Sequence, residues 1–264
     1  MQNTHISQSA RRPGILKRAF WTLKSHEGLY PTTPYGQQHV TARYQFALSQ
    51  MPLEGQIVDI GTATGYGIVN SGALHRFVGL DRNKYALRLG EYHHPELRGR
   101  LVHGDAVDLS QFRGMPGITA LEFIDHLRRP QKERFLQESE EALAPNGVLV
   151  MSTPLSFKPR TLDKFHFRKE LTLDAYRRLV EGHFPDTRYY GIGLMPRTRI
   201  ARYTVRAKEA LISLDPLQLR RVLPRRARSS ILHTLHGPPT IRPLDDYIRE
   251  GTLPRNIISV SVKK

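Results

Sequence analysis

The sequence predicts an α/β protein with a doubly wound, mostly parallel sheet of seven strands. A short apolar run, 57–60, enters a glycine-rich turn, 61–67, and leads directly into a helical pattern. Strand-like and helix-like segments then alternate five times, and carboxylates follow several of the strands. Because parallel strands bring their carboxyl ends to one edge of a sheet, these acidic residues predict a ligand site at that edge.

Two ligand-binding sequence patterns can be compared with the glycine turn. The dinucleotide pattern G-x-G-x-x-G needs a small residue at position 70, where this chain has Asn70. The pattern acidic-x-Gly-x-Gly-x-Gly fits Asp59, Gly61 and Gly65, but Ala63 stands at its middle glycine position. A tight turn that binds nothing is the third interpretation, because glycine also serves turns alone.

The other elements follow in chain order, each with helical spacing or a short apolar run. Helices are predicted over 39–51, 84–92 and 131–143, and strands over 76–80, 99–103, 117–123, 148–152, 187–192 and 256–262. Residues 144–147 predict the end of the third helix, because proline stops helices and Asn146-Gly147 suits left-handed backbone.

Two regions fall outside this alternation. The segment 1–27 starts polar and then mixes basic with large apolar residues at roughly helical spacing. It is either a helix packed on its own domain or a surface helix that lies on a membrane or acts as a lid. The main domain spans 28–264 and carries a basic insertion at about 195–252, before the last strand.

The charge is strongly basic. The chain has 264 residues with 40 Lys+Arg against 24 Asp+Glu, a formal net charge of +16. Such a net charge favours the binding of polyanions, although a role in general solubility explains it equally well. The insertion carries a cluster of five arginines: Arg220, Arg221, Arg225, Arg226 and Arg228. The cluster either binds the phosphates of a nucleic acid, nucleotide-linked sugar or lipid, or is a solvated helix face.

The composition also excludes several classes of protein. Cysteine is absent, which excludes disulfides, thiolate metal sites and a cysteine nucleophile. No apolar run reaches the ~20 residues of a membrane-spanning helix, and the N-terminus lacks the apolar segment of a secretory signal. We therefore expect a cytoplasmic protein, with the membrane surface as the alternative location.

Motifs after successive strands carry a family resemblance. They are Asp59-Ile60-Gly61 with Gly65-Tyr66-Gly67, Gly79-Leu80-Asp81, Gly104-Asp105-Ala106 and Glu122-Phe123-Ile124-Asp125-His126-Leu127. Over 28–193 the chain resembles class I S-adenosylmethionine-dependent methyltransferases, and within them the ubiquinone-pathway and sugar O-methyltransferases. The resemblance implies a Rossmann-like methyltransferase fold and S-adenosyl-L-methionine as cofactor. It also implies methyl transfer to an oxygen of a small-molecule, glycan- or lipid-linked acceptor.

The resemblance implies cofactor-binding roles for residues of the turn. Gly61, Thr62, Ala63 and Gly65 would line the methionine part of the cofactor, with Asp59 near its amino group.

It implies further roles at the following strand ends. Asp81 would hold the ribose hydroxyls, Asp105 the adenine amino group, and Ala106 a backbone contact beside it. Glu122 and Phe123 would lie beside the transferring methyl group.

An oxygen nucleophile benefits from a base that takes its proton, and His126 and His166 are the candidates. With 12 histidines in the chain, each is otherwise a structural residue. Glu122, Asp125 and His126 could supply metal ligands, but the family segment explains them better, so no metal is predicted. Two rival functions stay open: an RNA methyltransferase, favoured by the charge, and a non-catalytic cofactor-binding regulator, favoured by Ala63.

Overall fold

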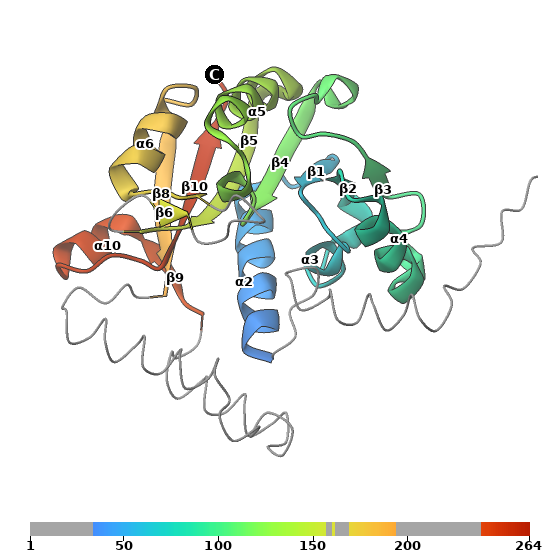
Figure 1. Cartoon of the computed structure of the whole chain (residues 1–264), viewed down its shortest axis with the longest axis horizontal. Helices are drawn as coiled ribbons and strands as arrows, with labels where there is room; N and C mark the ends of the chain where they lie inside the picture. The colour runs from blue at the N-terminus through green and yellow to red at the C-terminus, as the bar shows by residue number, and fades with distance from the viewer. Residues whose placement is uncertain (1–33, 157–159, 162–168, 194–238) are drawn as a thin grey trace, which may run out of the picture.

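A computed structural model describes residues 34–156, 160–161, 169–193 and 239–264. These residues form one twisted sheet with helices on both faces (Figure 1). The strands, in the spatial order β3-β2-β1-β4-β5-β10-β8-β9, are Leu101–His103, Phe77–Asp81, Ile57–Ile60, Met115–Leu121, Leu143–Pro154, Asn256–Val262, Thr187–Ile192 and Ile241–Pro243. A separate pair joins β6 (Arg160–Thr161) to β7 (Lys169–Glu170).

The sheet confirms the predicted fold class. Strands β3, β2, β1, β4 and β5 are parallel, and β10 runs antiparallel to both β5 and β8. The predicted number of strands was wrong, because the sheet has eight strands and not seven. The additional strand, β9, lies inside the predicted insertion and pairs with β8 at the sheet edge. Its three residues are too few to give a periodic signal in the sequence.

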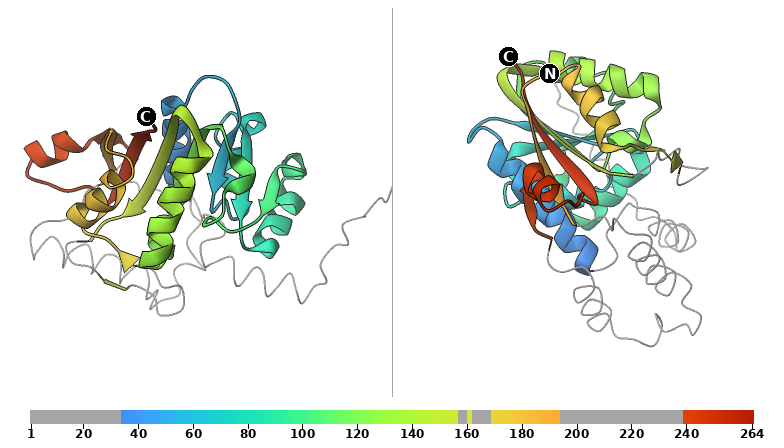
Figure 2. Two further views of the ribbon diagram at one scale, coloured as in Figure 1. Left: turned by 90° about the horizontal axis from the view of Figure 1, so that it is seen from above. Right: turned by 90° about the vertical axis from the view of Figure 1, so that its left-hand side faces the viewer.

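Helices lie on both faces of the sheet (Figure 2). The main helices are α2 (Pro34–Gln50), α3 (Tyr66–Val69), α4 (Lys84–His93), α5 (Arg129–Ala142), α6 (Leu173–Glu181) and α10 (Leu244–Arg249). Short 3-10 turns are η2 (Leu74–Arg76), η3 (Pro95–Leu97), η4 (Ser110–Phe112) and η5 (Ile124–His126). Helix α2 lies on one side of the sheet, and α5 and α6 lie on the other. Within the described ranges, no helix combines the length and apolar composition needed to cross a bilayer.

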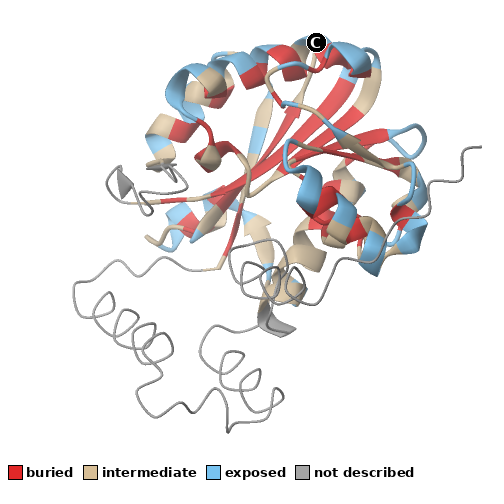
Figure 3. Cartoon of the chain, turned by 45° about the vertical axis from the view of Figure 1, so that its right-hand side comes forward, coloured by how far each residue is buried: buried red, intermediate tan, exposed pale blue. Residues whose placement is uncertain are grey.

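The strands in the middle of the sheet are largely buried (Figure 3). Strand β1 shows how the sheet divides the core into two apolar clusters. All four of its residues are buried, as expected of a strand in the middle of a parallel sheet. Ile57 belongs to the apolar cluster beneath α2, whereas Val58 and Ile60 belong to the cluster beneath α5 and α6. Asp59 shares the face of Ile57, since side chains alternate along a strand. This carboxylate therefore points toward α2.

The turn predicted at 144–147 lies inside β5. Helix α5 ends at Ala142, close to the predicted end, and Asn146 takes the expected left-handed conformation with φ of 61°. The strand nevertheless starts at Leu143, because Met115 pairs with Leu143 while Gly117 already pairs with Val148. The residues between form a bulge, which the sequence could not distinguish from a loop.

Two predicted features lie largely or wholly outside the described residues. They are the N-terminal segment, 1–27, and most of the insertion at about 195–252. The described part of the insertion forms β9 and α10, which pack against β8.

Candidate functional site

The glycine turn follows β1 at the carboxyl edge of the parallel strands. Gly61, Ala63 and Gly65 all have left-handed backbone, with φ of 72°, 52° and 70°. The amide groups of Gly61 and Thr62 both donate to the carbonyl oxygen of Leu80, at 2.8 and 3.2 Å, so the turn is anchored to β2. Ala63 therefore adopts the conformation that glycine adopts most easily, at a cost of about 1 kcal/mol.

Asp81 ends β2 directly across from this turn. Its Oδ2 accepts a hydrogen bond from the Ala63 amide at 2.8 Å, and its Oδ1 accepts one from the Asn83 amide at 2.7 Å. The residue is half-buried. Because each carboxylate oxygen can accept more than one hydrogen bond, both can still receive hydroxyl groups from a ligand. The turn and the carboxylate thus form one pre-organised unit.

Asp59 lies behind the turn and has no exposed surface. The Tyr44 hydroxyl donates to its Oδ2 at 2.8 Å, and the Thr119 hydroxyl donates to its Oδ1 at 2.7 Å. Burial raises the pKa of Asp59 to about 6, although these hydrogen bonds oppose the shift. Asp59 connects α2, β1 and β4, and its predicted contact with a cofactor amino group stays a prediction.

Phe123 packs directly on the glycine turn. A Cβ atom on Gly61 would lie 2.4 Å from Cδ2 of the Phe123 ring, which is closer than any real contact. The ring also meets Phe135 edge-on, with centroids 5.3 Å apart. The glycine at position 61 therefore serves both the left-handed turn and the close approach of this ring.

Glu122 is held by a network that spans four elements. Ser152 donates to its Oε1 at 2.9 Å, Asn256 donates to its Oε2 at 2.8 Å, and Nη1 of Arg43 lies 3.8 Å from Oε1. The backbone of Glu122 is left-handed, with φ of 57°, and its amide donates to the Ser152 carbonyl oxygen at 2.9 Å. The network joins α2, β4, β5 and β10 at the carboxyl edge.

No local sequence pattern indicates the partners of Glu122. Asn256 is separated from Glu122 by 134 positions, and Arg43 comes from a helix that precedes the first strand. Only the pairing of β10 with β5 brings Asn256 to this edge.

The remaining predicted residues differ in exposure. Asp105 is exposed after β3, where its Oδ1 accepts the Val107 amide at 3.2 Å, and Ala106 beside it is buried. His126 is half-buried in η5, just beyond β4. Its amide donates to the Phe123 carbonyl oxygen at 3.0 Å. Across the residues that the structure describes, no three histidine or acidic side chains gather as a metal site.

Several of the predicted site residues lie outside the described ranges. They are His166 and the arginine cluster Arg220, Arg221, Arg225, Arg226 and Arg228.

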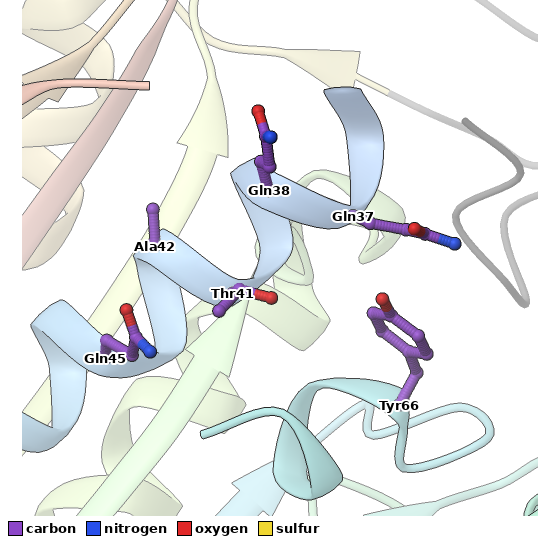
Figure 4. A pocket seen from close by; sticks show the side chains of 6 residues that line it. All are labelled: Gln37, Gln38, Thr41, Ala42, Gln45 and Tyr66. Carbon is purple, nitrogen blue, oxygen red and sulfur yellow. The ribbon is translucent and has the colours of Figure 1, made fainter. Parts of the chain in front are cut away.

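A pocket of about 440 Å³ opens between α2 and the start of α3 (Figure 4). Its walls are Gln37, Gln38, Thr41, Ala42, Gln45 and Tyr66. Tyr66 directly follows Gly65, so the pocket adjoins the glycine turn. No motif marks this pocket in the sequence, although the spacing of positions 37, 41 and 45 places polar side chains on one helix face.

No family model matches the sequence, and no curated protein does. Among solved structures, the chain is similar to an S-adenosylmethionine-dependent methyltransferase from Archaeoglobus fulgidus, with a TM-score of 0.55 at 14% identity over 93% of this chain and 99% of that one. It is also similar to one from Thermotoga maritima, with a TM-score of 0.54 at 13% identity over 94% and 98%.

A third similar structure holds a cofactor product. It is the O-methyltransferase of a trans-AT PKS multienzyme from Brevibacillus brevis, in complex with S-adenosyl-L-homocysteine. Its TM-score is 0.53 at 14% identity, over 94% of this chain and 78% of that one. These likenesses establish that the chain has the Rossmann-like α/β fold of class I S-adenosylmethionine-dependent methyltransferases.

Proposed function

We propose that this protein is a class I S-adenosylmethionine-dependent methyltransferase. The observation that carries the proposal is the unit formed by the glycine turn and Asp81, which the Ala63 amide holds at 2.8 Å. In a doubly wound sheet this edge is where ligands bind, and a carboxylate at the end of the second strand suits ribose hydroxyls. The similar solved structures include one that contains S-adenosyl-L-homocysteine, which supports the same ligand here.

The hydrogen-bond acceptors at the strand ends fit the cofactor. Asp81 would accept hydrogen bonds from the two ribose hydroxyls, and Asp105, exposed at the next strand end, would accept one from the adenine amino group. The left-handed residues Gly61, Ala63 and Gly65 shape the turn that would surround the methionine part. When bound, S-adenosylmethionine supplies a methyl group that its positively charged sulfur already activates. The protein then needs mainly to align an acceptor and exclude water.

We further propose an oxygen of a small-molecule, glycan- or lipid-linked acceptor as the methyl recipient. His126 lies just beyond β4, next to the Glu122 and Phe123 corner, and would accept the proton of an acceptor hydroxyl on an imidazole nitrogen. Both carboxylate oxygens of Glu122 already accept hydrogen bonds, one from Ser152 and one from Asn256, so this side chain is held by the protein. This leaves His126 as the better candidate among the described residues.

Calorimetric titration with S-adenosylhomocysteine tests the cofactor assignment. We expect micromolar binding by the unaltered chain and at least tenfold weaker binding by Asp81→Ala. Asp108→Ala is the matched control, because Asp108 also accepts a neighbouring amide, that of Ser110 at 3.2 Å, but does not face the turn. Equal affinity in all three proteins would contradict the ribose assignment, and absence of binding would remove the proposed function.

The net charge of +16 favours a second candidate, an RNA methyltransferase. Binding of RNA through phosphates weakens steeply with salt, since cations are released. Fluorescence anisotropy with a labelled RNA therefore separates the candidates. The salt concentration is varied between roughly 50 and 200 mM, the range over which phosphate-mediated binding loses most of its affinity. A flat salt response would count against RNA as the acceptor.

A further inference from the structure

Arg43 carries a largely buried charge with one distant partner. Its side chain is 11% exposed, and its Nη1 lies 3.8 Å from Oε1 of Glu122, which is too far for a hydrogen bond. Among the described residues, the guanidinium makes no other ion pair and no hydrogen bond, although it has several N–H donors. Because burial of a charge without close partners costs free energy, ligand binding explains this guanidinium better than stability does.

A second arginine shows that this chain also forms close pairs. Arg242 donates to both carboxylate oxygens of Glu250, at 2.7 and 3.1 Å. Glu122 does not pair with Arg43 in this way, because hydrogen bonds from β5 and β10 hold its two oxygens, at 2.9 and 2.8 Å. The carboxylate of Glu122 is therefore fixed by the sheet, and the donors of Arg43 stay available to a ligand.

Arg43 lies where the glycine turn meets the end of β4. Burial raises the pKa of the neighbouring Tyr44 hydroxyl, and the positive charge of Arg43 opposes this shift, so its charge reaches the buried side of the turn. Glu122, on the other side of the guanidinium, directly precedes Phe123, whose ring packs on Gly61. A ligand over the turn is thus bordered by Arg43.

The glycine turn itself offers few donors to an anion. Four of its backbone amides already donate within the protein, those of Gly61, Thr62, Ala63 and Gly65. An anionic group of a ligand over this turn therefore depends on a side-chain cation. Arg43 is the one lysine or arginine of α2.

A carboxylate suits Arg43 better than a phosphate does. A guanidinium donates paired hydrogen bonds to the two oxygens of one carboxylate. Asp81 and Glu122 already place negative charge around the turn, and they repel a doubly charged phosphate more strongly than a singly charged carboxylate. The single cation at this corner thus matches a single negative charge.

We infer that Arg43 binds a ligand carboxylate at the carboxyl edge of the sheet, between the glycine turn and Glu122. This inference rests on the proposed function and adds a ligand-positioning residue to it. Two ligands of a methyltransferase can supply the carboxylate: the cofactor, through its methionine end, and the acceptor. The chemistry at Arg43 is the same for both, so experiments with one ligand at a time separate them.

Calorimetric titration of the full chain tests the cofactor as the source. The probes are S-adenosylhomocysteine and 5′-deoxy-5′-(3-aminopropylthio)adenosine, which keeps the amino group but lacks the carboxylate. If the cofactor supplies the carboxylate, the unaltered chain should prefer S-adenosylhomocysteine by about tenfold or more, and Arg43→Met should reduce this preference below about threefold. Arg177→Met is the matched control, because Arg177 pairs with Glu181 at 3.0 Å on α6, and it should keep the preference.

Saturation-transfer NMR on the complex with S-adenosylhomocysteine tests the acceptor as the source. Benzoate and benzamide are the probes, because they share a shape and differ in charge. If the acceptor supplies the carboxylate, transfer to benzoate should exceed transfer to benzamide by about threefold or more in the unaltered chain and in Arg177→Met. Arg43→Met should show equal transfer to both.

The inference is overturned if the unaltered chain shows neither preference, or if Arg43→Met keeps every preference that the unaltered chain shows. An equal loss of affinity for both adenosine compounds in Arg43→Met would also overturn it, because such a loss indicates a structural role. Arg43→Lys repeats the measurements if Arg43→Met does not fold. It keeps the charge but loses the paired hydrogen bonds, so it should lower the observed preference by about threefold.

Failure of the proposed function gives a different pattern. If the unaltered chain binds neither adenosine compound, the proposed function fails. Transfer to benzoate and benzamide without S-adenosylhomocysteine then still decides whether Arg43 binds a carboxylate.

Discussion

The two halves of the carboxyl edge are built differently. The half beyond β1 and β2 is made by the backbone, with left-handed turns and one carboxylate held by the Ala63 amide. The half beneath α2 is made by side chains from distant elements, which meet in the Glu122 network. The first half depends on local backbone geometry, whereas the second depends on which helices and strands pack together.

The first half should be the less tolerant of substitution, and Gly61→Ala gives the largest expected effect. The new Cβ atom would lie 2.4 Å from the Phe123 ring. The alanine would also have to adopt the left-handed backbone of Gly61. We expect a loss of about 2–4 kcal/mol in the free energy of unfolding, from overpacking together with backbone strain.

Gly72→Ala is the matched control in a urea unfolding measurement. Gly72 is also left-handed, with φ of 87°, but nothing lies within 4 Å of its added Cβ, so only the backbone cost of about 1 kcal/mol remains. Equal losses in the two variants would show that Phe123 does not crowd the turn.

Asp59 links the two halves, and its protonation should change the free energy of unfolding with pH. Its folded pKa of about 6 exceeds the ordinary value of 3.8, so the folded state binds more protons between these values. The stabilisation that protonated Asp59 contributes to the free energy of unfolding is fully present below about pH 4. It is lost as pH rises through about 6, which lowers the free energy of unfolding by roughly 3 kcal/mol.

Asp59→Asn stays uncharged and should lack this loss. The other titrating groups are shared, so the difference in unfolding free energy between the two proteins isolates Asp59 when measured from pH 4 to 7. Parallel pH profiles would contradict the raised pKa.

The smallest expected effect concerns the departure from the glycine pattern. Ala63→Gly relieves the left-handed strain at φ of 52° but loosens the unfolded chain, so stability should change by less than about 1 kcal/mol. The affinity for S-adenosylhomocysteine should stay within about threefold, because the amide that holds Asp81 is kept. A large gain in affinity would instead mean that Ala63 impairs the turn, as the non-catalytic alternative requires.

The same contrast explains what the sequence could predict. The turn, Asp81 and the parallel strands are local patterns, and each reads directly from consecutive residues. The eighth strand, the bulge at 144–147 and the partners of Glu122 depend on which strands pair, and short segments carry no such information. Asp59 was predicted at the turn, but its burial against Tyr44 depends on where α2 packs.

A crystal structure with S-adenosylhomocysteine tests the division of the edge most directly. We predict the nucleoside over the glycine turn, with both ribose hydroxyls about 2.7 Å from the Asp81 carboxylate, and no part of the ligand in the pocket between α2 and Tyr66. Adenosine or homocysteine bound among Gln37, Thr41 and Gln45, away from Asp81, would contradict it.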